Sequence, residues 1–333
     1  MSFALMLFIV AVALLFDFMN GFHDAANSIA TVVSTRVLSP RMGVLWAAFF
    51  NFVAAFGFGV SVASTIGAGI IATDIVTDWL ILSTLAGAIA WDMITWWLGL
   101  PTSSSHALVG GLVGAGIVGG GWSVVQAGNI GMIALFIALS PIVGLIAALG
   151  LILVTSRIAR RFARPLVDRT FRRLQLVSAA LYSLGHGTND AQKTMGVIAL
   201  LLFTEGLIGP VFFVPFYVVL MAHAAIALGT YFGGWRIVRT MGMKITKLTP
   251  FGGFSAETSA ASVLFLTAHL GIPVSTTHTI AGAIIGVGIT RRVSAVRWWV
   301  ARRIVYAWIL TIPASAAISA ATYYTLRLLL GIV

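Results

Sequence analysis

The sequence contains no cysteine, and only 9% of its 333 residues carry a charge. Without cysteine the chain forms no disulfide and has no thiolate chemistry. Soluble domains carry about 25% charged residues, so a chain this poor in charge does not fit an ordinary water-soluble fold. Among the charged residues the acidic ones are the fewer, with nine Asp and Glu against twenty Lys and Arg, so the formal net charge is +11. These shortages indicate a membrane protein.

Hydrophobic residues make up 59% of the sequence. A helix needs about 20 apolar residues to cross a bilayer, and a chain of this length has room for roughly ten such segments. Backbone groups in lipid must pair within their own segment, so we expect helices. The expected segments are 3–34, 42–72, 79–98, 102–119, 129–155, 174–203, 211–234, 256–270, 275–290 and 299–330. The sequence therefore predicts an all-α polytopic membrane protein.

The basic residues gather in four of the connections between these segments, namely 36–41, 157–173, 236–247 and 291–303. The acidic Asp74, Asp78 and Glu205 fall in other connections. This asymmetry is typical of the positive-inside rule and predicts that the basic connections face the cytoplasm. No RNA-binding motif accompanies them, and no cleavable signal peptide is evident. We expect a multi-pass protein of the plasma membrane, in a prokaryote the inner membrane, in contact with lipid and not with nucleic acid.

Two polar motifs occur once in each half of the chain. The stretch NGFHDAANS at 20–28 aligns with HGTNDAQKT at 186–194, at an offset of 166 (186 minus 20). The stretch GLPTSSSH at 99–106 aligns with GIPVSTTH at 271–278, at an offset of 172 (271 minus 99). Two motifs in one order at nearly one spacing indicate internal duplication.

The loop charges predict that the two halves have opposite orientations. The first segment must reach the cytoplasm at Arg36, whereas 174–203 leaves it from Arg173. We therefore predict two inverted-topology repeats, each with a broken helix and a helical hairpin. The first repeat is 1–155, a basic cytoplasmic linker spans 156–173, and the second repeat is 174–333. Hairpins over 79–119 and 256–290 are favoured over full crossings because their tips carry no charge to hold them in water.

Each hairpin tip places a proline and hydroxyl residues inside apolar sequence. Proline favours the first turn of a helix, so the residues after it are expected at a helix N-terminus within the membrane. Free N–H groups, hydroxyls and the helix dipole form an anion site there, and two facing copies would suit a tetrahedral oxyanion. The candidates are Ser103, Ser104, Ser105, Ser275, Thr276 and Thr277. The alternative is that these hydroxyls only hydrogen-bond to carbonyls and hold neighbouring helices together. The presence of a matched copy in each half favours the anion site over this alternative.

The other motif places Asp24 and Asp190 within apolar segments, where a carboxylate costs at least ~2.5 kcal/mol. A carboxylate with amide and carbonyl oxygens suits Na⁺ or a proton relay. The neighbouring amides are those of Asn20, Asn27, Asn189 and Gln192. Gly21 and Gly187 are expected to loosen the helices and expose carbonyls. A packing role in which Asp190 pairs with Lys193 is the alternative.

Other functions fit less well. An intramembrane metalloenzyme would need a ligand spacing such as HExxH, which the sequence lacks, so we predict neither an enzyme, nor a metal site, nor a cofactor. An anion channel would conduct without coupling, whereas a buried Asp pair suggests an ion whose binding is linked to that of the anion. Asp92 and Glu257 lie in the first arms of the hairpins, and a gate, a proton group and an interfacial residue all remain open for them.

These motifs resemble those of the inorganic phosphate transporter family, whose members carry a repeated Gly-x-Asn-Asp-type signature and a repeated Pro-x-Ser-(Ser/Thr)-x-His tip. The resemblance spans nearly the whole chain, which is short for the family. The second-half signature follows the family pattern closely, whereas His23 stands where many members, including sodium-coupled ones, have Asn. This form resembles the low-affinity bacterial permeases associated with proton coupling.

The resemblance implies import of phosphate, free or as a neutral metal–phosphate complex, by cation symport with alternating access. Phosphate is expected between the tips, helped by Asn27, Gln192 and Lys193. The coupling ion, H⁺ rather than Na⁺, is expected at Asp24 and Asp190 with Asn20, Asn189 and His23. Some relatives carry sulfate, but two carboxylates beside the anion favour phosphate, which still holds protons near neutral pH. A homodimer is left open.

Overall fold

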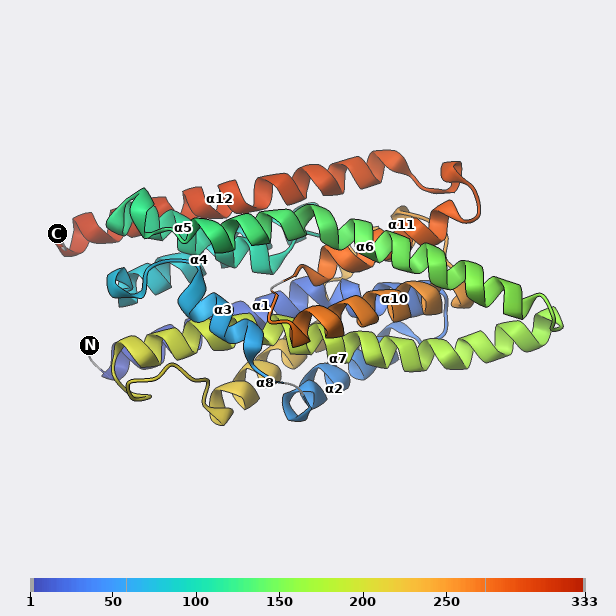
Figure 1. Cartoon of the computed structure of the whole chain (residues 1–333), viewed down its shortest axis with the longest axis horizontal. Coiled ribbons are helices and arrows are strands. Elements are labelled where there is room, and N and C mark those ends of the chain that lie inside the picture. Colours follow the sequence, from blue (N-terminus) through green and yellow to red (C-terminus); the bar gives the residue numbers. More distant parts are fainter. Residues whose placement is uncertain (1–2, 58, 273, 332–333) are drawn as a thin grey trace.

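Four long helices run along the longest axis of the molecule (Figure 1). The computed structural model describes residues 3–57, 59–272 and 274–331, where the one β contact is an isolated bridge between Ile71 and Val125. The long helices are α1 (Phe3–Ser34), α6 (Ala127–Ala159), α7 (Arg164–Thr204) and α12 (Trp298–Leu330). The expectation of an all-α polytopic protein is confirmed.

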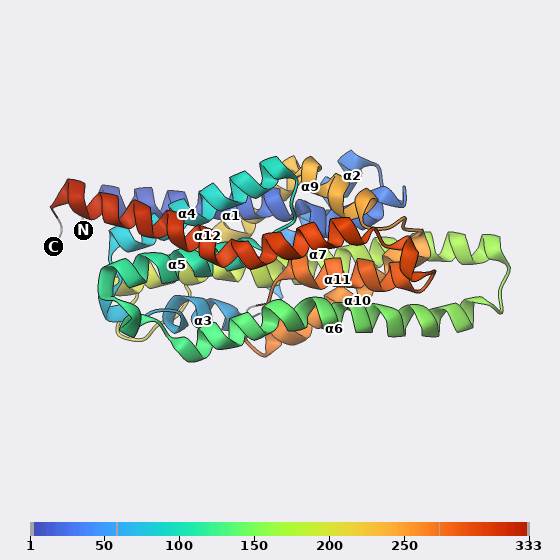
Figure 2. The same ribbon diagram turned by 90° about the horizontal axis from the view of Figure 1, so that it is seen from above.

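Two helical hairpins lie between the long helices. They are α4 (Asp78–Leu98) with α5 (Ser104–Gly120), and α10 (Pro250–His269) with α11 (Thr276–Ile289). Figure 2 shows the two hairpins entering from opposite ends of the molecule, with their turns near its middle. The hairpins are built alike: a threonine caps the first arm, and a glycine in the left-handed region, Gly99 at φ 65° or Gly271 at φ 67°, follows its end.

The remaining helices form broken segments, one in each half. In the first half, α2 (Pro40–Val53) is followed by the 3₁₀ turn η1 (Ala54–Phe56) and by α3 (Ser61–Gly69). In the second half, α8 (Phe216–Phe232) meets α9 (Trp235–Arg239) and the π-helical turn η4 (Thr240–Lys244) at a bend of 62°. Short 3₁₀ turns complete the chain: η2 (Thr73–Ile75), η3 (Trp122–Val124) and η5 (Val293–Ala295).

Within the described residues, α1, α4, α6 and α12 are long and apolar enough to cross a membrane, and α8 with α9 makes a fifth span if the bent pair is counted as one. Their outer faces carry exposed apolar side chains, such as Leu135, Ile146 and Leu153 of α6. In water this surface would be unfavourable, whereas lipid tails solvate it. The chain is a multi-pass membrane protein.

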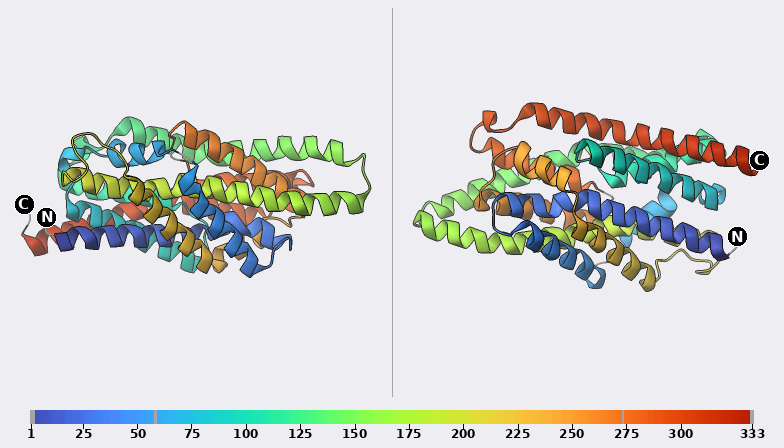
Figure 3. Two further views of the ribbon diagram at one scale, coloured as in Figure 1. Left: turned by 90° about the horizontal axis from the view of Figure 1, so that it is seen from below. Right: turned by 180° about the vertical axis from the view of Figure 1, so that it is seen from behind.

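Charge is distributed unequally between the two ends of the molecule. Both termini lie at one end and the α6–α7 connection lies at the other (Figure 3). The four basic connections lie at the α6–α7 end, whereas the α7–α8 connection, which carries Glu205, and the start of α4 at Asp78 lie at the end with the termini. This separation is the one expected from the positive-inside rule.

The second arm of each hairpin packs on a long helix of the other half. Helix α5 packs on α12, and α11 packs on α6. A Cβ on Gly114 would lie 2.1 Å from the carbonyl oxygen of Ala316, and one on Gly282 would lie 2.0 Å from that of Pro141. Only glycine permits these backbones to approach so closely. The second arm of each hairpin is therefore packed closely against a helix of the opposite half of the chain.

Two details differ from the expectations. Helices α1 and α7 continue unbroken through the Asp motifs, so the prediction that Gly21 and Gly187 loosen them is wrong. A Cβ on Gly21 would lie 2.1 Å from the carbonyl oxygen of Ile226, so this glycine instead allows α8 to approach α1. The basic linker 156–173 is largely helical, because α6 continues to Ala159 and α7 begins at Arg164.

Candidate functional site

The two hairpin tips each begin a helix inside the molecule. Ser103 is the N-cap of α5 and its Oγ accepts a hydrogen bond from the His106 N–H at 3.4 Å. Ser275 is the N-cap of α11 and accepts from the His278 N–H at 3.2 Å. Each cap uses an acceptor lone pair of the hydroxyl and fixes the direction of its helix. Pro273, the counterpart of Pro101, lies outside the described residues.

The two helix N-termini face each other across the centre of the molecule. The rings of His106 and His278 have their centroids 4.9 Å apart, and His278 also stacks on Trp308 at 3.9 Å. All six predicted tip residues are at most 7% exposed. Free N–H groups and the positive ends of two helix dipoles therefore converge on a buried region, which favours a bound anion.

Helices α1 and α7 bring the two Asp motifs to the same place. One ligand atom from each of Asp24, His186 and Asp190 lies within 4.8 Å of the others, and all three residues are buried. Two carboxylates so close together repel each other unless cations or hydrogen-bond donors compensate them. The donors around each carboxylate therefore define the site.

Asp24 receives its hydrogen bonds from a histidine and a threonine. Its Oδ1 lies 2.7 Å from Nδ1 of His23, and its Oδ2 accepts from the Thr277 hydroxyl at 3.2 Å. The other ring nitrogen of His23 lies 3.1 Å from the Thr95 hydroxyl and 3.4 Å from the Thr102 hydroxyl, so the ring connects the carboxylate to the first hairpin.

Asp190 is compensated by a lysine as well. The Lys193 ammonium pairs with its Oδ1, while its Oδ2 accepts from the Thr276 hydroxyl at 2.8 Å and lies 3.1 Å from Nε2 of His186. Lys193 also donates to the Ser105 hydroxyl and, at 3.2 Å, to the Val274 carbonyl. Asp190 and Lys193 thus link α7 to both tips.

Asn27 also reaches a tip, since its Nδ2 donates to the Thr277 hydroxyl at 2.8 Å. The other predicted amides bond elsewhere. Asn20 lies 3.5 Å from Asp17, and Asn189 donates to the Gly185 and Leu264 carbonyls at 2.9 and 3.0 Å. Asn20 thus bonds within α1, whereas Asn189 joins α7 to α10.

Gln192 bonds to the start of α3. Its Oε1 accepts from the Val62 N–H at 2.8 Å, and its Nε2 donates to the Gly59 carbonyl at 2.8 Å. Gln192 also lines a cavity of about 370 Å³ together with Thr188 and His269. Its hydrogen bonds therefore join α7 to the start of α3 rather than to the tips.

His186 was not among the residues predicted for the site, although it stands in the second-half motif. Its Nδ1 lies 3.2 Å from the Asn51 oxygen, which orients the ring toward Asp190. Because an α-helix repeats every 3.6 residues, the spacing of His186 and Asp190, i and i+4, places them on one face and could have indicated this contact. The hydroxyls of Thr95 and Thr102 were missed as well.

Asp92 and Glu257 are both fully buried in the first arms of the hairpins. Glu257 accepts from the Gln175 amide at 3.0 Å and from the Ser178 hydroxyl, so it joins α10 to α7. Asp92 lies near enough to His23 and Asp24 to interact with them electrostatically. Of the two residues, Asp92 is therefore the one that interacts with the residues around Asp24.

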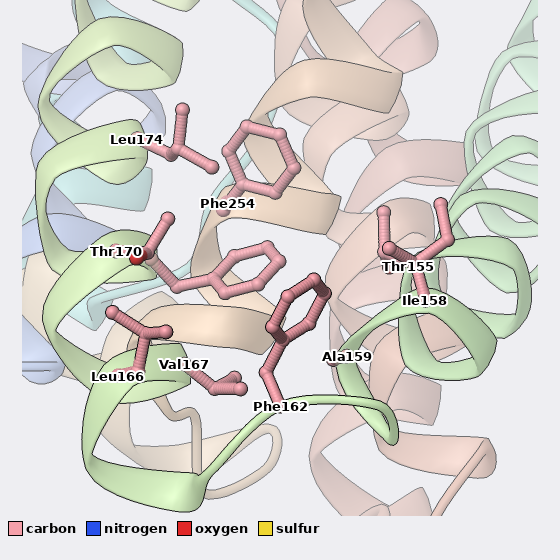
Figure 4. A pocket seen from close by; sticks show the side chains of 10 residues that line it. Thr155, Ile158, Ala159, Phe162, Leu166, Val167, Thr170, Leu174 and Phe254 are labelled. Atoms are coloured by element: carbon pink, nitrogen blue, oxygen red, sulfur yellow. The ribbon is translucent and has the colours of Figure 1, made fainter.

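A second cavity, of about 350 Å³, lies away from this centre, where α6 ends and α7 begins (Figure 4). Apolar side chains surround it, including Leu166 of α7, Phe254 of α10 and Phe162 of the connection between α6 and α7. It offers no converging polar donors of the kind an anion needs.

Comparison with known proteins agrees with this geometry. Residues 20–319 match the family model described as "Phosphate transporter family". A probable low-affinity inorganic phosphate transporter of Rhizobium meliloti is 59% identical over 324 residues, covering 97% of each chain. Another of Bacillus subtilis is 41% identical and covers 98% of each chain. A solved structure described as the sodium-dependent phosphate transporter is similar with a TM-score of 0.88 and 27% identity, covering 98% of this chain and 99% of that one.

Proposed function

The chain belongs to the phosphate transporter family, and from that premise we propose that it imports inorganic phosphate across the plasma membrane by cation symport, with protons favoured over sodium. It is a transporter and not an enzyme. The observation that carries the proposal is the meeting of two helix N-termini, marked by His106 and His278 at 4.9 Å, beside two buried carboxylates. An anion site and a cation site in direct contact are what symport requires, because each ion then stabilises the other.

The proposed phosphate site lies between the hairpin tips. Hydroxyls and free N–H groups there can donate to the four oxygens of the anion, and low exposure strengthens these hydrogen bonds. The proposed ligands are Ser103, Ser104, Ser105, Ser275, Thr276 and Thr277, with Asn27, Gln192 and Lys193 beside them. Gln192 belongs to the approach to the site, since it lines the 370 Å³ cavity. Phosphate enters free or as a neutral metal–phosphate complex.

The proposed coupling site consists of Asp24 and Asp190, with Asn20, Asn189 and His23 around them. Protons are favoured because each carboxylate has a histidine ring nitrogen close by, at 2.7 Å for Asp24 and 3.1 Å for Asp190. A histidine can carry a proton on and off such a carboxylate. The similar solved structure is described as sodium-dependent, so Na⁺ is the competing ion.

Alternating access through inverted repeats is the proposed transport cycle. The reciprocal packing of α5 on α12 and of α11 on α6 supports it, because each hairpin can then move with the opposite half. Every residue at the centre is buried, so access requires one hairpin to shift at a time. The 370 Å³ cavity beside Gln192 is a candidate for one entrance.

Sulfate is the alternative substrate. Both anions are tetrahedral, but phosphate still carries a proton near neutral pH and can donate it to a carboxylate. Sulfate cannot, so Asp24 and Asp190 repel it without a compensating hydrogen bond.

Uptake of labelled phosphate into proteoliposomes tests the proposal. We expect accumulation driven by an imposed inward proton gradient, weaker accumulation under a Na⁺ gradient, and little competition from sulfate. Absence of accumulation under either gradient would overturn the coupling, and efficient competition by sulfate would overturn the choice of anion. Liposomes without protein serve as the control for passive entry of phosphate.

A further inference from the structure

Lys193 occupies the position in the second half that Asn27 occupies in the first. Each follows its aspartate by three residues, and the two positions differ by the same 166 residues as Asp24 and Asp190 (193 minus 27 and 190 minus 24). A neutral amide in one half is therefore replaced by an ammonium in the other.

The contacts of these two side chains correspond as well. Asn27 donates to the Thr277 hydroxyl at 2.8 Å, and Lys193 donates to the Ser105 hydroxyl. Ser105 and Thr277 are themselves aligned positions of the two tips, 172 residues apart (277 minus 105). Each side chain thus crosses from the Asp helix of its own half to the tip of the other half. The geometry is duplicated, and the charge is not.

The Lys193 ammonium is coordinated as a bound cation would be. Its three N–H groups meet a carboxylate oxygen of Asp190, the Ser105 hydroxyl and, at 3.2 Å, the Val274 carbonyl. Carboxylate, hydroxyl and carbonyl oxygens are also the ligands that a hard cation prefers. The residue is only 1% exposed, so its ammonium is shielded from bulk water.

The charge at the centre follows from these contacts. Of the two carboxylates, Asp190 forms an ion pair with the Lys193 ammonium. Asp24 has no lysine, since its donors are His23 and Thr277. Of this pair, Asp24 is therefore the carboxylate left to hold an exchangeable cation when an anion enters.

We propose that Lys193 is a built-in cation that occupies the place of one coupling ion beside Asp190, so that the transporter moves one cation fewer per phosphate. This inference rests on the proposed function. It assigns ion exchange to the Asp24–His23 pair and a fixed charge to the Asp190–Lys193 pair. Lys193 then determines the number of coupling ions and reaches phosphate only through Ser105.

The test compares wild type with Lys193→Asn, which copies the first half into the second. Removing the ammonium leaves Asp190 in need of a mobile cation. In proteoliposomes with clamped voltage and ion gradients, the variant should move one more positive charge with each phosphate than wild type. Its final phosphate gradient should therefore depend more steeply on the membrane voltage. One charge corresponds to a tenfold steeper gradient for roughly every 60 mV. The variant should also require more Na⁺ or H⁺ than wild type.

Lys247→Asn is the matched control, because it removes an exposed lysine from a basic connection. It should leave the voltage dependence unchanged. A Lys193→Asn protein with wild-type voltage dependence and ion requirement would overturn the inference and leave the proposed function intact. Wild-type protein without coupled uptake would overturn the proposed function itself, before any variant is compared.

A second measurement covers the case in which Lys193→Asn does not accumulate phosphate. Phosphate exchange at equal concentrations is then compared for Lys193→Asn, Asp190→Asn and the double variant. With Lys193 as counter-charge, the double variant is neutral and should exchange at least tenfold faster than Lys193→Asn alone. With Lys193 as a phosphate ligand only, the double variant would be no faster, and the inference would be wrong.

Discussion

The Asp24 and Asp190 sites stand on equivalent helices and face the same centre, yet they are compensated differently. Asp24 has His23 and Thr277 as donors, whereas Asp190 has the Lys193 ammonium together with Thr276 and a nearby His186. The two aligned motifs place two aspartates in matching positions on α1 and α7. The neighbouring side chains differ, so that Asp190 has a lysine as its partner and Asp24 has a histidine, and on our proposal only Asp24 exchanges a cation.

The largest expected effect comes from breaking the fixed pair. Asp190→Ala leaves the buried Lys193 without a counter-charge, which costs about 3–5 kcal/mol of folding free energy. A lower unfolding midpoint in detergent, measured by intrinsic tryptophan fluorescence, checks this. The control is Asp168→Ala, which removes an exposed partner of Arg172 at 2.9 Å and should cost less than ~1 kcal/mol. Equal losses would mean that the Asp190–Lys193 pair contributes no more than a surface pair.

Asp24→Asn addresses the exchangeable site. The amide keeps the shape of the side chain and still accepts from Thr277, but it has no negative charge to hold a cation and takes up no proton near neutral pH. We expect gradient-driven phosphate accumulation to fall by about 5- to 150-fold, the range of a typical coupling free energy, while phosphate exchange falls less. Proteoliposome uptake and exchange measured side by side check this. Equal loss of both activities would assign Asp24 to phosphate binding instead.

The close helix contacts of the two halves can be compared by adding one methyl group to each. Gly114→Ala would press on the Ala316 carbonyl and Gly282→Ala on the Pro141 carbonyl, where the added Cβ would lie 2.1 and 2.0 Å from the oxygen. Overpacking of this kind costs about 1–3 kcal/mol, and we expect similar losses in the two halves. Gly128→Ala has no neighbouring atom within 4 Å and serves as control in the same unfolding assay. A destabilisation confined to one half would show that the reciprocal packing is unequal.

The smallest expected effects come from the two capping serines. Ser103→Ala and Ser275→Ala each remove the hydroxyl that caps a tip helix, at a cost of about 0.5–2 kcal/mol. Both variants should raise the KM for phosphate modestly, because the N–H groups that they orient belong to the proposed anion site. Uptake at varied phosphate concentration measures this. A KM raised in one variant only would mean that the tips contribute unequally to binding.

Much of the fold could be predicted from the sequence, because lipid removes most alternatives. Apolar segment 3–34 is α1 (Phe3–Ser34), and the Pro-Ser-His motifs do mark helix starts at Ser104 and Thr276. The helical character of the linker 156–173 was not predicted, since its arginines indicate only that it lies outside the membrane. The effect of Gly21 was misjudged, because a glycine that loosens a helix and one that admits a neighbouring helix look alike in sequence.

The sequence alone determined that the chain is a helical membrane protein, where the two tip helices begin and which two motifs occur in both halves. These features depend on local hydropathy, on proline and on charge, which act over a few neighbouring residues. The tertiary structure decided the partners: Asn27 with Thr277, Lys193 with Ser105, and His23 with Thr95. Such pairs join residues far apart in the chain and depend on how close α1 and α7 pack to the hairpins. Packing distances of this kind leave no periodic signal in a single sequence, so only the folded chain shows that the two aspartates meet and that one of them already holds a cation.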